Sequence, residues 1–378
     1  MKFRKAKNYI SSGSVSKQTW IRFRKNKLGL FALSWILAST IISILGYTIT
    51  PDSTPFANNQ NLELAAQKPG FFVQILMIPS ENPVEKTSLL QGVFFGYKPR
   101  FDEIPIHSFT SDNEQIFFEK FTGSEPNDGE IFTLNKSDFS QNHIDNKAHI
   151  INRTYHIGTD RFGRDMLSQI IIGSRVSLSV GFIAVLISLL IGISLGLVSG
   201  FYGGKTDQLI MWFINVVWSI PTLLLVIALT MALGRGFWQV FIAVGLTMWV
   251  EVARVVRGQV MSIRNKEFVE AGIALGYSKF RILFRHILPN VTSPLIVISA
   301  ANFASAILVE AGLSFLGIGV QPPMPSWGTM IKEHYGYIIL DKAYLALLPG
   351  FAIMLMVLAF MLVGNALRDA LDVKIVKE

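Results

Sequence analysis

The stretch EAGIALGYSKFRILFRHILPN, residues 270–290, predicts two short helices joined by a glycine turn. The residues from Glu267 to Leu275 are strong helix formers, and Gly276 suits the left-handed position that ends a helix. Ser278 is a good N-cap for the second helix, and Pro289 is expected to stop it. The stretch therefore predicts a rigid helix–turn–helix.

The second of these helices is predicted to have two unlike faces. Helical spacing places five apolar residues on one face, namely Phe280, Leu283, Phe284, Ile287 and Leu288. A polar and cationic set shares another face, namely Ser278, Arg281 and Arg285. Two interpretations fit these faces equally well on physical grounds. Either anionic lipid headgroups hold the helix at a membrane surface, or the helix is a docking surface for a soluble partner.

The rest of the chain is unusually apolar. Of 378 residues, 51% are hydrophobic and 16% are charged, which predicts an all-α polytopic membrane protein. Six runs are about long enough to cross a bilayer as helices: Leu28–Ile49, Val176–Val198, Leu209–Leu233, Phe237–Val256, Val291–Leu313 and Tyr344–Leu367. Cysteine is absent, which excludes disulfides and thiol chemistry. The net charge of +8 is concentrated beside the runs, which favours membrane topology over nucleic-acid binding.

Charge also predicts the orientation of the six helices. The first run follows nine basic residues with no acid among them, and it is longer than the apolar core of a signal peptide. We therefore expect an uncleaved anchor with a cytoplasmic N-terminus. Six crossings then place both termini in the cytoplasm. The loop assigned to residues 251–286 is rich in Arg and Lys and falls on the cytoplasmic side, whereas residues 51–165 hold more acids than bases and fall outside. Pro221 is expected to kink the third helix.

These spans divide the chain into parts. The predicted boundaries are a cytoplasmic basic tail at 1–27, a transmembrane helix at 28–50, an extracytoplasmic insert at 51–165, a core of five further helices at 166–367 with a cytoplasmic loop at 258–290, and a cytoplasmic tail at 368–378. The insert between the first two helices is predicted to be a small mixed α/β subdomain. Its segment FFVQILMI, residues 71–78, is too short to span and is expected to form core or an interfacial helix.

The segment GFYGGKTD, residues 200–207, has some residues of a phosphate-binding loop but does not match its full pattern. That loop requires a glycine where Ser199 stands, and it follows a buried strand rather than a membrane helix. We expect a tight turn at Gly200, Gly203 and Gly204 instead. No other stretch fits a nucleotide site, so the energy for any transport must come from another chain.

Residues 270–290 resemble the EAA loop of ABC-transporter permeases, whose pattern is an EAA triplet, a later glycine and a hydrophobic-LP ending. Glu270, Ala271, Gly276, Leu288 and Pro289 match that pattern, while Gly272 replaces the third alanine and His286 replaces an isoleucine. The variant RHILPN is similar to the dipeptide/oligopeptide subfamily. Three further stretches resemble the same subfamily: residues 156–181, 249–272 and 310–331.

The resemblance implies a six-helix type I ABC-importer permease in the bacterial inner membrane. It implies that the chain forms half of a pathway for di- and oligopeptides and is not an enzyme. The expected partners are a second, related permease in a heterodimer, two ABC ATPases that bind ATP-Mg, an extracytoplasmic binding protein and membrane lipid. No cofactor, metal or nucleic acid is expected on this chain. The residues expected to couple it to the ATPases are Glu270, Ala271, Gly272, Gly276, Ser278, Arg281, Arg285 and Pro289.

A second set of residues is expected at the outer face, as the external gate and the binding-protein surface. It comprises Gly158, Asp160, Gly163, Arg164, Asp165, Glu310, Pro322, Pro323 and Trp327. The acids and arginines of GTDRFGRD, residues 158–165, are expected to neutralise one another rather than to bind metal or phosphate. A short helix is expected after them. Glu310 lies near the outer end of a span, where a structural hydrogen bond is favoured over substrate contact. Trp327 suits the interface belt.

Other functions remain open at this point. Relatives within the subfamily carry nickel chelates, glutathione or peptide antibiotics, and no residue here separates these substrates. A channel or receptor with a working external domain is a further alternative, although it needs no ATPase-docking helix. A membrane enzyme is disfavoured because the spans hold no His, Asp, Glu or Ser set with catalytic spacing.

Overall fold

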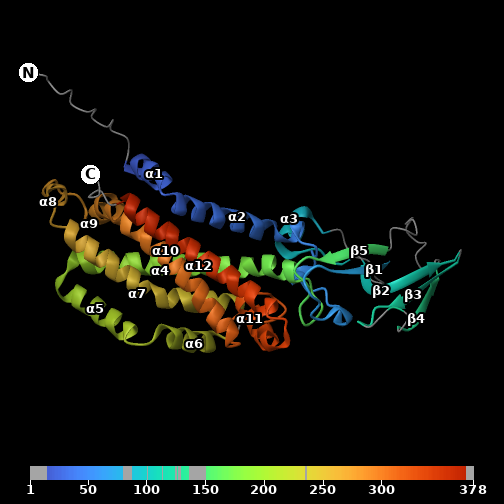
Figure 1. Ribbon diagram of the computed structural model, residues 1–378. Helices are drawn as coiled ribbons and strands as arrows, with labels where there is room; N and C mark the ends of the chain where they lie inside the picture. Colours follow the sequence, from blue (N-terminus) through green and yellow to red (C-terminus); the bar gives the residue numbers. More distant parts are fainter. Residues whose placement is uncertain are drawn as a thin grey trace, which may run out of the picture.

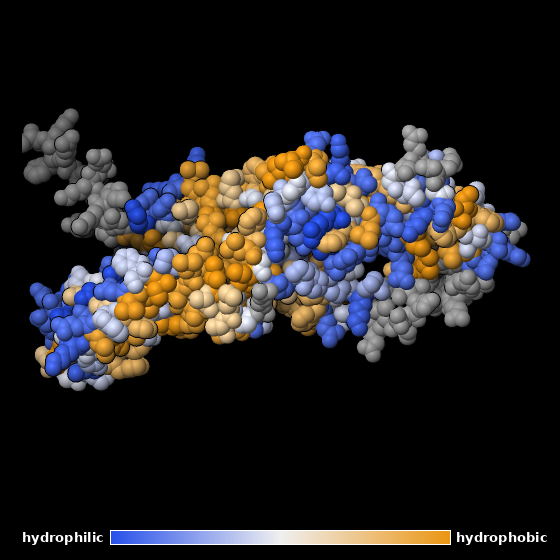
Figure 2. All heavy atoms as spheres, turned by 90° about the horizontal axis from the view of Figure 1, so that it is seen from below, coloured by the Kyte–Doolittle hydropathy of each residue, from blue (hydrophilic) through white to orange (hydrophobic). Residues whose placement is uncertain are grey.

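The computed structural model describes residues 15–79, 87–99, 101–112, 114–123, 126, 129–135, 150–234 and 236–371. The outer parts of the two predicted tails, 1–14 and 372–378, lie outside the described residues. A long helical bundle carries a β-sheet domain at one end and the short helices α8 and α9 at the other (Figure 1). Hydrophobic side chains cover the bundle between these ends, and hydrophilic ones gather at the α8–α9 end (Figure 2).

Five helices are long and apolar enough to cross a membrane, and a bent pair makes up to six if it counts as one span. The five are α2 (Lys27–Ile49), α4 (Met166–Tyr202), α7 (Phe237–Ile263), the run Lys279–Phe315 and α12 (Tyr344–Leu371). The bent pair is α5 (Gly204–Trp218) and α6 (Thr222–Leu233). The remaining helices are α1 (Val15–Lys25), α8 (Glu267–Ala274), α9 (Lys279–Arg281), the π-helical turn η5 (Ile282–Ile287), α10 (Leu288–Phe315) and α11 (Trp327–His334).

Three helices differ from the sequence prediction. α4 begins at Met166, so the expected short separate helix is instead the first turns of a 37-residue helix. α7 continues to Ile263, which places Glu251 inside a helix and not in a loop. At Pro221 the chain turns by 90° between α5 and α6, far more than a kink. Proline has no backbone N–H to continue the helical ladder, and here it caps the next helix instead.

Pro289 does not stop a helix, contrary to the sequence prediction. The helical run passes from α9 through the π-helical turn η5 into α10. In that turn the Leu288 N–H bonds the Leu283 carbonyl, five residues back. This wider turn changes the register of the backbone hydrogen bonds. The proline therefore falls in the first turn of α10, where its missing N–H needs no partner. The helix that the sequence predicted as a separate unit is therefore continuous with a span.

The closest helix pair is α4 with α7, and glycines make it close. Three glycines of α4, spaced by four residues, face three valines of α7 with the same spacing: Gly192, Gly196 and Gly200 against Val252, Val256 and Val260. A Cβ added at Gly196 would lie 2.6 Å from the Cβ of Val256. Small residues at this spacing let two helix backbones approach closely in a membrane. Gly200 therefore packs against a helix and does not form the predicted turn, which lies at Gly203 and Gly204 with positive φ.

We expect Gly196→Ala to lower the unfolding free energy by about 1–3 kcal/mol, because the added methyl overlaps Val256 and must push α4 from α7. The matched control is Gly258→Ala on α7, where an added Cβ meets nothing within 4 Å. The control should be neutral or slightly stabilising, because alanine is the better helix former. Thermal unfolding of the detergent-solubilised protein measures both. Equal melting temperatures for the two variants would contradict the packing argument.

The sheet domain lies between α2 and α4 in the chain. Its five antiparallel strands have the order β4-β3-β2-β1-β5, and a short helix, α3 (Leu89–Phe95), accompanies them. The strands are β1 (Phe71–Pro79), β2 (Phe101–Ser111), β3 (Gln115–Lys120), β4 (Ile131–Asn135) and β5 (Ile150–Tyr155). FFVQILMI is therefore strand β1, not a helix. β1 pairs with β2 on one side and with β5 on the other. The sequence of a central, buried strand of this kind is often a continuous apolar run.

Both described ends of the chain lie at the α8–α9 end of the bundle (Figure 1). Phe23 of α1 packs against Ala366 and Ala370 of α12. An even number of crossings follows from this geometry. The bent pair α5 and α6 must then count as one passage along the bundle.

Candidate functional site

The α8–α9 end of the bundle is built by two adjacent caps. Gly276 has φ +74°, its N–H bonds the Ile273 carbonyl at 2.9 Å, and the Tyr277 N–H bonds the Gly272 carbonyl at 3.0 Å. These two bonds form the Schellman motif that ends α8. The Ser278 hydroxyl then accepts the Arg281 N–H at 3.3 Å and begins α9. The predicted end at Gly276 and cap at Ser278 are confirmed.

The predicted apolar face of the second helix is wrong in part. Leu283 and Ile287 are buried together with Ile282, but Phe280 is 70% exposed and Phe284 is 47% exposed. Their two rings contact each other, with centroids 4.4 Å apart. The prediction assumed 3.6 residues per turn, whereas the π-helical turn η5 has a wider repeat. The change of repeat turns the two phenylalanines away from the bundle.

Five exposed apolar side chains lie between the start of α8 and the turn η5, and we call them the tip patch: Phe268, Ile273, Leu275, Phe280 and Phe284. Exposed charged residues flank the patch, including Glu270, Arg281 and Arg285. Among the described residues, the Glu270 carboxylate has no hydrogen bond or ion pair, while Arg281 lies over the Tyr277 ring at 4.0 Å. An exposed apolar cluster rimmed by charge is typical of a protein-interaction surface.

The two departures from the EAA pattern fit this geometry. A Cβ added at Gly272 would meet Tyr277 at 3.5 Å, an ordinary contact, so the usual alanine would also fit. The His286 ring stacks on Tyr277 with centroids 5.7 Å apart. Its Nε2 atom is buried without a hydrogen-bond partner among the described residues. Ala271 and Pro289 are exposed, and Pro289 begins α10 as described above.

An ion pair and further hydrogen bonds join three bundle helices next to the tip. The Arg257 guanidinium on α7 donates two hydrogen bonds to Asp207 on α5, at 2.5 and 2.6 Å. Asp207 also accepts the hydroxyl of Ser199 on α4. Arg264, which caps α7 just before α8, donates to the Gly200 carbonyl at 3.2 Å. Directional bonds therefore join α4, α5 and α7 at this end of the bundle.

A buried ion-pair network lies at the opposite end of the bundle. The Arg164 side chain, 5% exposed, donates to Asp160 at 2.6 Å and to Glu333 of α11 at 3.0 Å. Asp160 also accepts the backbone N–H groups of Phe162 and Arg164. Gly158 and Gly163 supply the positive φ angles of the turn. The charges neutralise one another, as the sequence analysis expected.

The two carboxylates of this network are neutralised by an arginine. Asp160, Glu333 and His334 have potential ligand atoms within 4.8 Å of one another. However, the guanidinium of Arg164 lies between the two acids. The His334 Nδ1 atom is 2.7 Å from the Met330 carbonyl, and burial lowers the pKa of His334. The positive charge that the two carboxylates need is already present.

Asp165 has a separate role beside this network. Its carboxylate accepts the Ser168 N–H at 2.8 Å and the Ser168 hydroxyl, and so caps α4. Burial raises the pKa of Asp165. The Ser168 hydroxyl in turn accepts the Asp52 N–H at 3.0 Å. The cap therefore joins the start of α4 to the segment that follows α2.

Glu310 is fully buried in α10. It accepts the Ser314 hydroxyl at 2.7 Å and lies 3.4 Å from the Ser177 hydroxyl of α4. Ser314 also accepts the Val320 N–H at 3.2 Å, which attaches the loop after α10. These contacts fit a structural role better than substrate contact.

The loop between α10 and α11 differs from the sequence prediction at one residue. Pro322 and Pro323 are exposed, as a surface loop requires. Trp327, expected in the interface belt, is 3% exposed and donates its indole N–H to the Ile170 carbonyl at 3.0 Å. The bulky indole packs between α4 and α12 because its one polar group finds a partner there.

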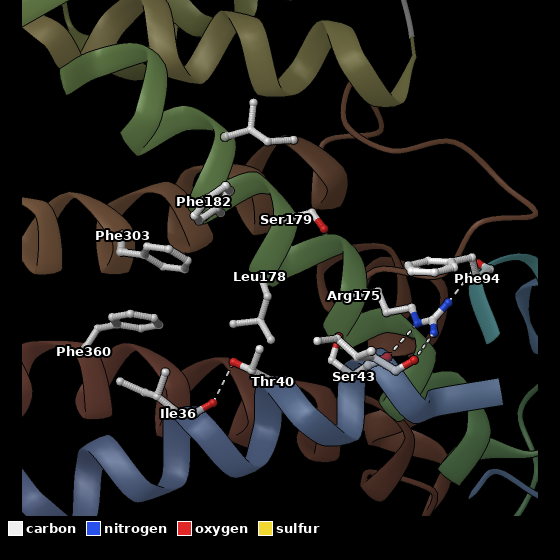
Figure 3. Close-up of a pocket in the computed structure, with 12 residues that line it drawn as sticks. Ile36, Thr40, Ser43, Phe94, Arg175, Leu178, Ser179, Phe182, Phe303 and Phe360 are labelled. Atoms are coloured by element: carbon white, nitrogen blue, oxygen red, sulfur yellow. Dashed lines mark hydrogen bonds between the residues drawn. The ribbon is translucent and has the colours of Figure 1, made fainter. Parts of the chain in front are cut away.

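A groove with a volume of about 500 Å³ lies between α2, α4, α10 and α12 (Figure 3). Phe303 and Phe360 stack at one end of it, and Arg175 lies at the other. Arg175 donates to four backbone carbonyls, those of Ser43, Ile44, Val93 and Phe94. The lining of the groove is mainly apolar. Its single charge is engaged by the chain itself.

Comparisons with known proteins follow this geometry. Residues 192–377 match the family described as binding-protein-dependent transport system inner membrane component. Residues 14–69 match the N-terminal TM domain of oligopeptide transport permease C. A methionine ABC transporter, MetNI, in an inward-facing conformation aligns with a TM-score of 0.46 and 19% identity, over 55% of this chain and 98% of the other.

Three curated relatives are similar over most of their length. The dipeptide transport system permease protein DppC of Alkalihalophilus pseudofirmus is 41% identical over 64% of this chain and 79% of the relative. The oligopeptide permease OppC of Haemophilus influenzae is 42% identical over 58% and 71%. The glutathione permease GsiD of Pectobacterium atrosepticum is 40% identical over 58% and 72%.

The fold and these matches define a multi-pass membrane permease subunit, not an enzyme. The chain belongs to the binding-protein-dependent family of ABC-importer permeases. The sequence did not predict three structural features of this chain. The glycine stripe on α4 was visible as a four-residue spacing. The exposure of Phe280 and Phe284 and the mid-helix position of Glu251 had no such signal.

Proposed function

We propose that this chain is one of two permease subunits in an ABC importer of peptides, and that the tip patch docks an ATPase. The tip patch carries the proposal. It is a set of exposed apolar side chains at one end of the bundle, with a rigid cap at Gly276 and a Glu270 carboxylate that has no partner among the described residues. The similarity to dipeptide and oligopeptide permeases supports peptides as the substrate class.

In this proposal, ATP-driven closure of two ATPase subunits moves two tips, one on each permease. ATP-Mg is bound by the ATPases and not by this chain. The load passes from α8 through Arg264 to α4 and through the Asp207–Arg257 pair to α5 and α7. The residues that make or shape the docking surface are Glu270, Ala271, Gly272, Gly276, Ser278, Arg281, Arg285 and Pro289.

The orientation follows from the same assignment. The tails at 1–27 and 368–378 and the loop at 258–290 lie in the cytoplasm, because ATPases are cytoplasmic. The segment 51–165 is then extracytoplasmic and the chain resides in the bacterial inner membrane. The basic N-terminal tail supports this side. The helix at 28–50 and the core at 166–367 span the bilayer.

The outer end meets an extracytoplasmic binding protein in this proposal. Its surface includes the turn with Gly158 and Gly163, the network of Asp160 and Arg164, and the loop with Pro322 and Pro323. Asp165, Glu310 and Trp327 hold this end together from inside. A second, non-identical permease completes the pathway.

Purification from the native membrane tests the assignment. With a tag on this chain, we expect to recover two ATPase subunits and a second permease in one complex. Proteoliposomes of that complex, supplied with its binding protein, should take up di-, tri- or longer peptides when ATP is present. Recovery of this chain alone would favour a channel or receptor. Uptake of glutathione or nickel chelates without peptides would keep the importer and change the substrate.

A further inference from the structure

A second hollow, of about 230 Å³, lies where α5 bends into α6. Residues from four elements line it, among them Trp218, Thr222, Thr247, Glu251 and Ser305. They come from the end of α5, the start of α6, and the facing sides of α7 and α10. We call this space the bend hollow. Three hydroxyl side chains line it and, unlike the groove beside α2, it also has an acid in its wall.

Glu251 lies near the middle of α7, a helix long and apolar enough to cross a membrane. α7 has 27 residues and is about 40 Å long, and Glu251 lies about 20 Å from either end. A carboxylate at that depth is costly in contact with hydrocarbon, so such groups face protein or water. Yet Glu251 is exposed, and it has no hydrogen bond or ion pair within the described part of the chain.

The other acids in the long apolar helices are accounted for. Asp207 pairs with Arg257, and Glu310 is buried against hydroxyl groups. Asp369 lies in the last turn of α12, away from the bilayer centre. Arg254, one turn from Glu251, donates to Asn215 at 3.1 Å and lies over the Trp218 ring. Glu251 alone among these acids is both at mid-depth and unpaired.

The break between helices α5 and α6, beside Glu251, also indicates a site that faces protein or water. α5 and α6 meet at 90° around Ser219 and Pro221, with non-helical backbone between them. Such backbone at membrane depth is tolerated only where it is buried in protein or lines a water-filled cavity. In secondary transporters, sites at the bilayer midplane are built from discontinuous helices of this kind.

From these observations we infer that the bend hollow is one wall of the translocation pathway, and that Glu251 binds the α-ammonium group of a passing peptide. The inference rests on the proposed function. The volume of about 230 Å³ is below the roughly 300–1,000 Å³ of a complete ligand pocket, as one of two walls should be. The carboxylate provides a charge-assisted acceptor for the ammonium, and the nearby hydroxyls provide further hydrogen bonds.

The chain has no cysteine, so Glu251→Cys introduces its only thiol. In the complete importer, we expect a membrane-impermeant cationic methanethiosulfonate to modify Cys at this position, and a transported tripeptide with a free amino terminus to slow the modification. The matched control is Leu190→Cys, an exposed apolar position of α4 at a similar distance from the tip end. It should not react, because it faces hydrocarbon.

A second variant tests the charge. Glu251→Gln should lower uptake of that tripeptide about tenfold, the loss expected when one charge-assisted bond becomes neutral. Glu114→Gln, in the sheet domain, should leave uptake unchanged. No thiol modification, or modification without protection by peptide, would overturn the inference. If the unaltered importer takes up peptide in the same preparation, that failure leaves the proposed function intact, whereas absence of any peptide uptake refutes the proposed function itself.

Discussion

Glu270→Lys should leave the protein inserted in the membrane and abolish ATP-driven uptake, with a loss of at least about tenfold. Glu270 is exposed beside the tip patch and has no partner in the described chain, so its carboxylate is free to meet a cationic group of the ATPase. Reversing its charge sets like charges against each other across the interface, at a cost of several kcal/mol. Hydrolysis by the ATPases is expected to continue without transport.

The measurement compares ATP hydrolysis and peptide uptake in proteoliposomes that hold equal amounts of complex. Glu114→Lys is the control, because it makes the same charge change on an exposed residue of the sheet domain at the other end of the molecule. The control should retain both activities. If Glu270→Lys still couples hydrolysis to uptake, Glu270 has no part in docking.

Arg164→Met is expected to have the largest effect on stability. Arg164 is 5% exposed and neutralises both Asp160 and Glu333. Removing the guanidinium leaves the buried Asp160 carboxylate without its cation and leaves Glu333 only its 3.6 Å pair with Arg161, and breaking a buried pair in this way typically costs about 3–5 kcal/mol. The loss should appear as a lower melting temperature of the solubilised protein.

Lys68→Met is the matched control for this loss. It removes a cation whose pair with Asp341 is exposed and 3.9 Å long, and such pairs contribute about 0–1 kcal/mol. A double variant that adds Asp160→Asn to Arg164→Met should lose less than the sum of the two single losses, because one unpaired charge has been removed. Equal melting temperatures for Arg164→Met and Lys68→Met would refute the network's structural role.

Local rules predicted much of the tip but not its outer surface. Gly276 ends α8 because glycine tolerates positive φ, and Ser278 caps α9 because its hydroxyl reaches the next free N–H. Both are properties of a few neighbouring residues. The outward position of Phe280 and Phe284 depends instead on the π-helical turn that brings Pro289 into α10. A prediction that assumes the 3.6 residues per turn of a regular α-helix does not include that turn.

The same contrast holds at the outer end. The opposite charges within GTDRFGRD predicted mutual neutralisation, since Asp160 and Arg164 are close in sequence. Their third partner, Glu333, comes from α11 and was not foreseen. Trp327 was assigned to an interface by its type, but packing against α4 gave its indole a buried partner.

The sequence by itself determined the series of long apolar helices, the caps of α8 and α9 and, through the EAA stretch, the family. These features depend on composition and on neighbours along the chain, which fix hydrophobic length and local backbone geometry. Only the tertiary structure decided where the chain breaks and what each exposed group faces. It placed α5 and α6 at 90° to each other, packed α4 against α7 along three glycines, and left Glu251 of α7 without a hydrogen bond or ion pair among the described residues. Those outcomes depend on contacts between helices distant in sequence, which hydropathy does not encode.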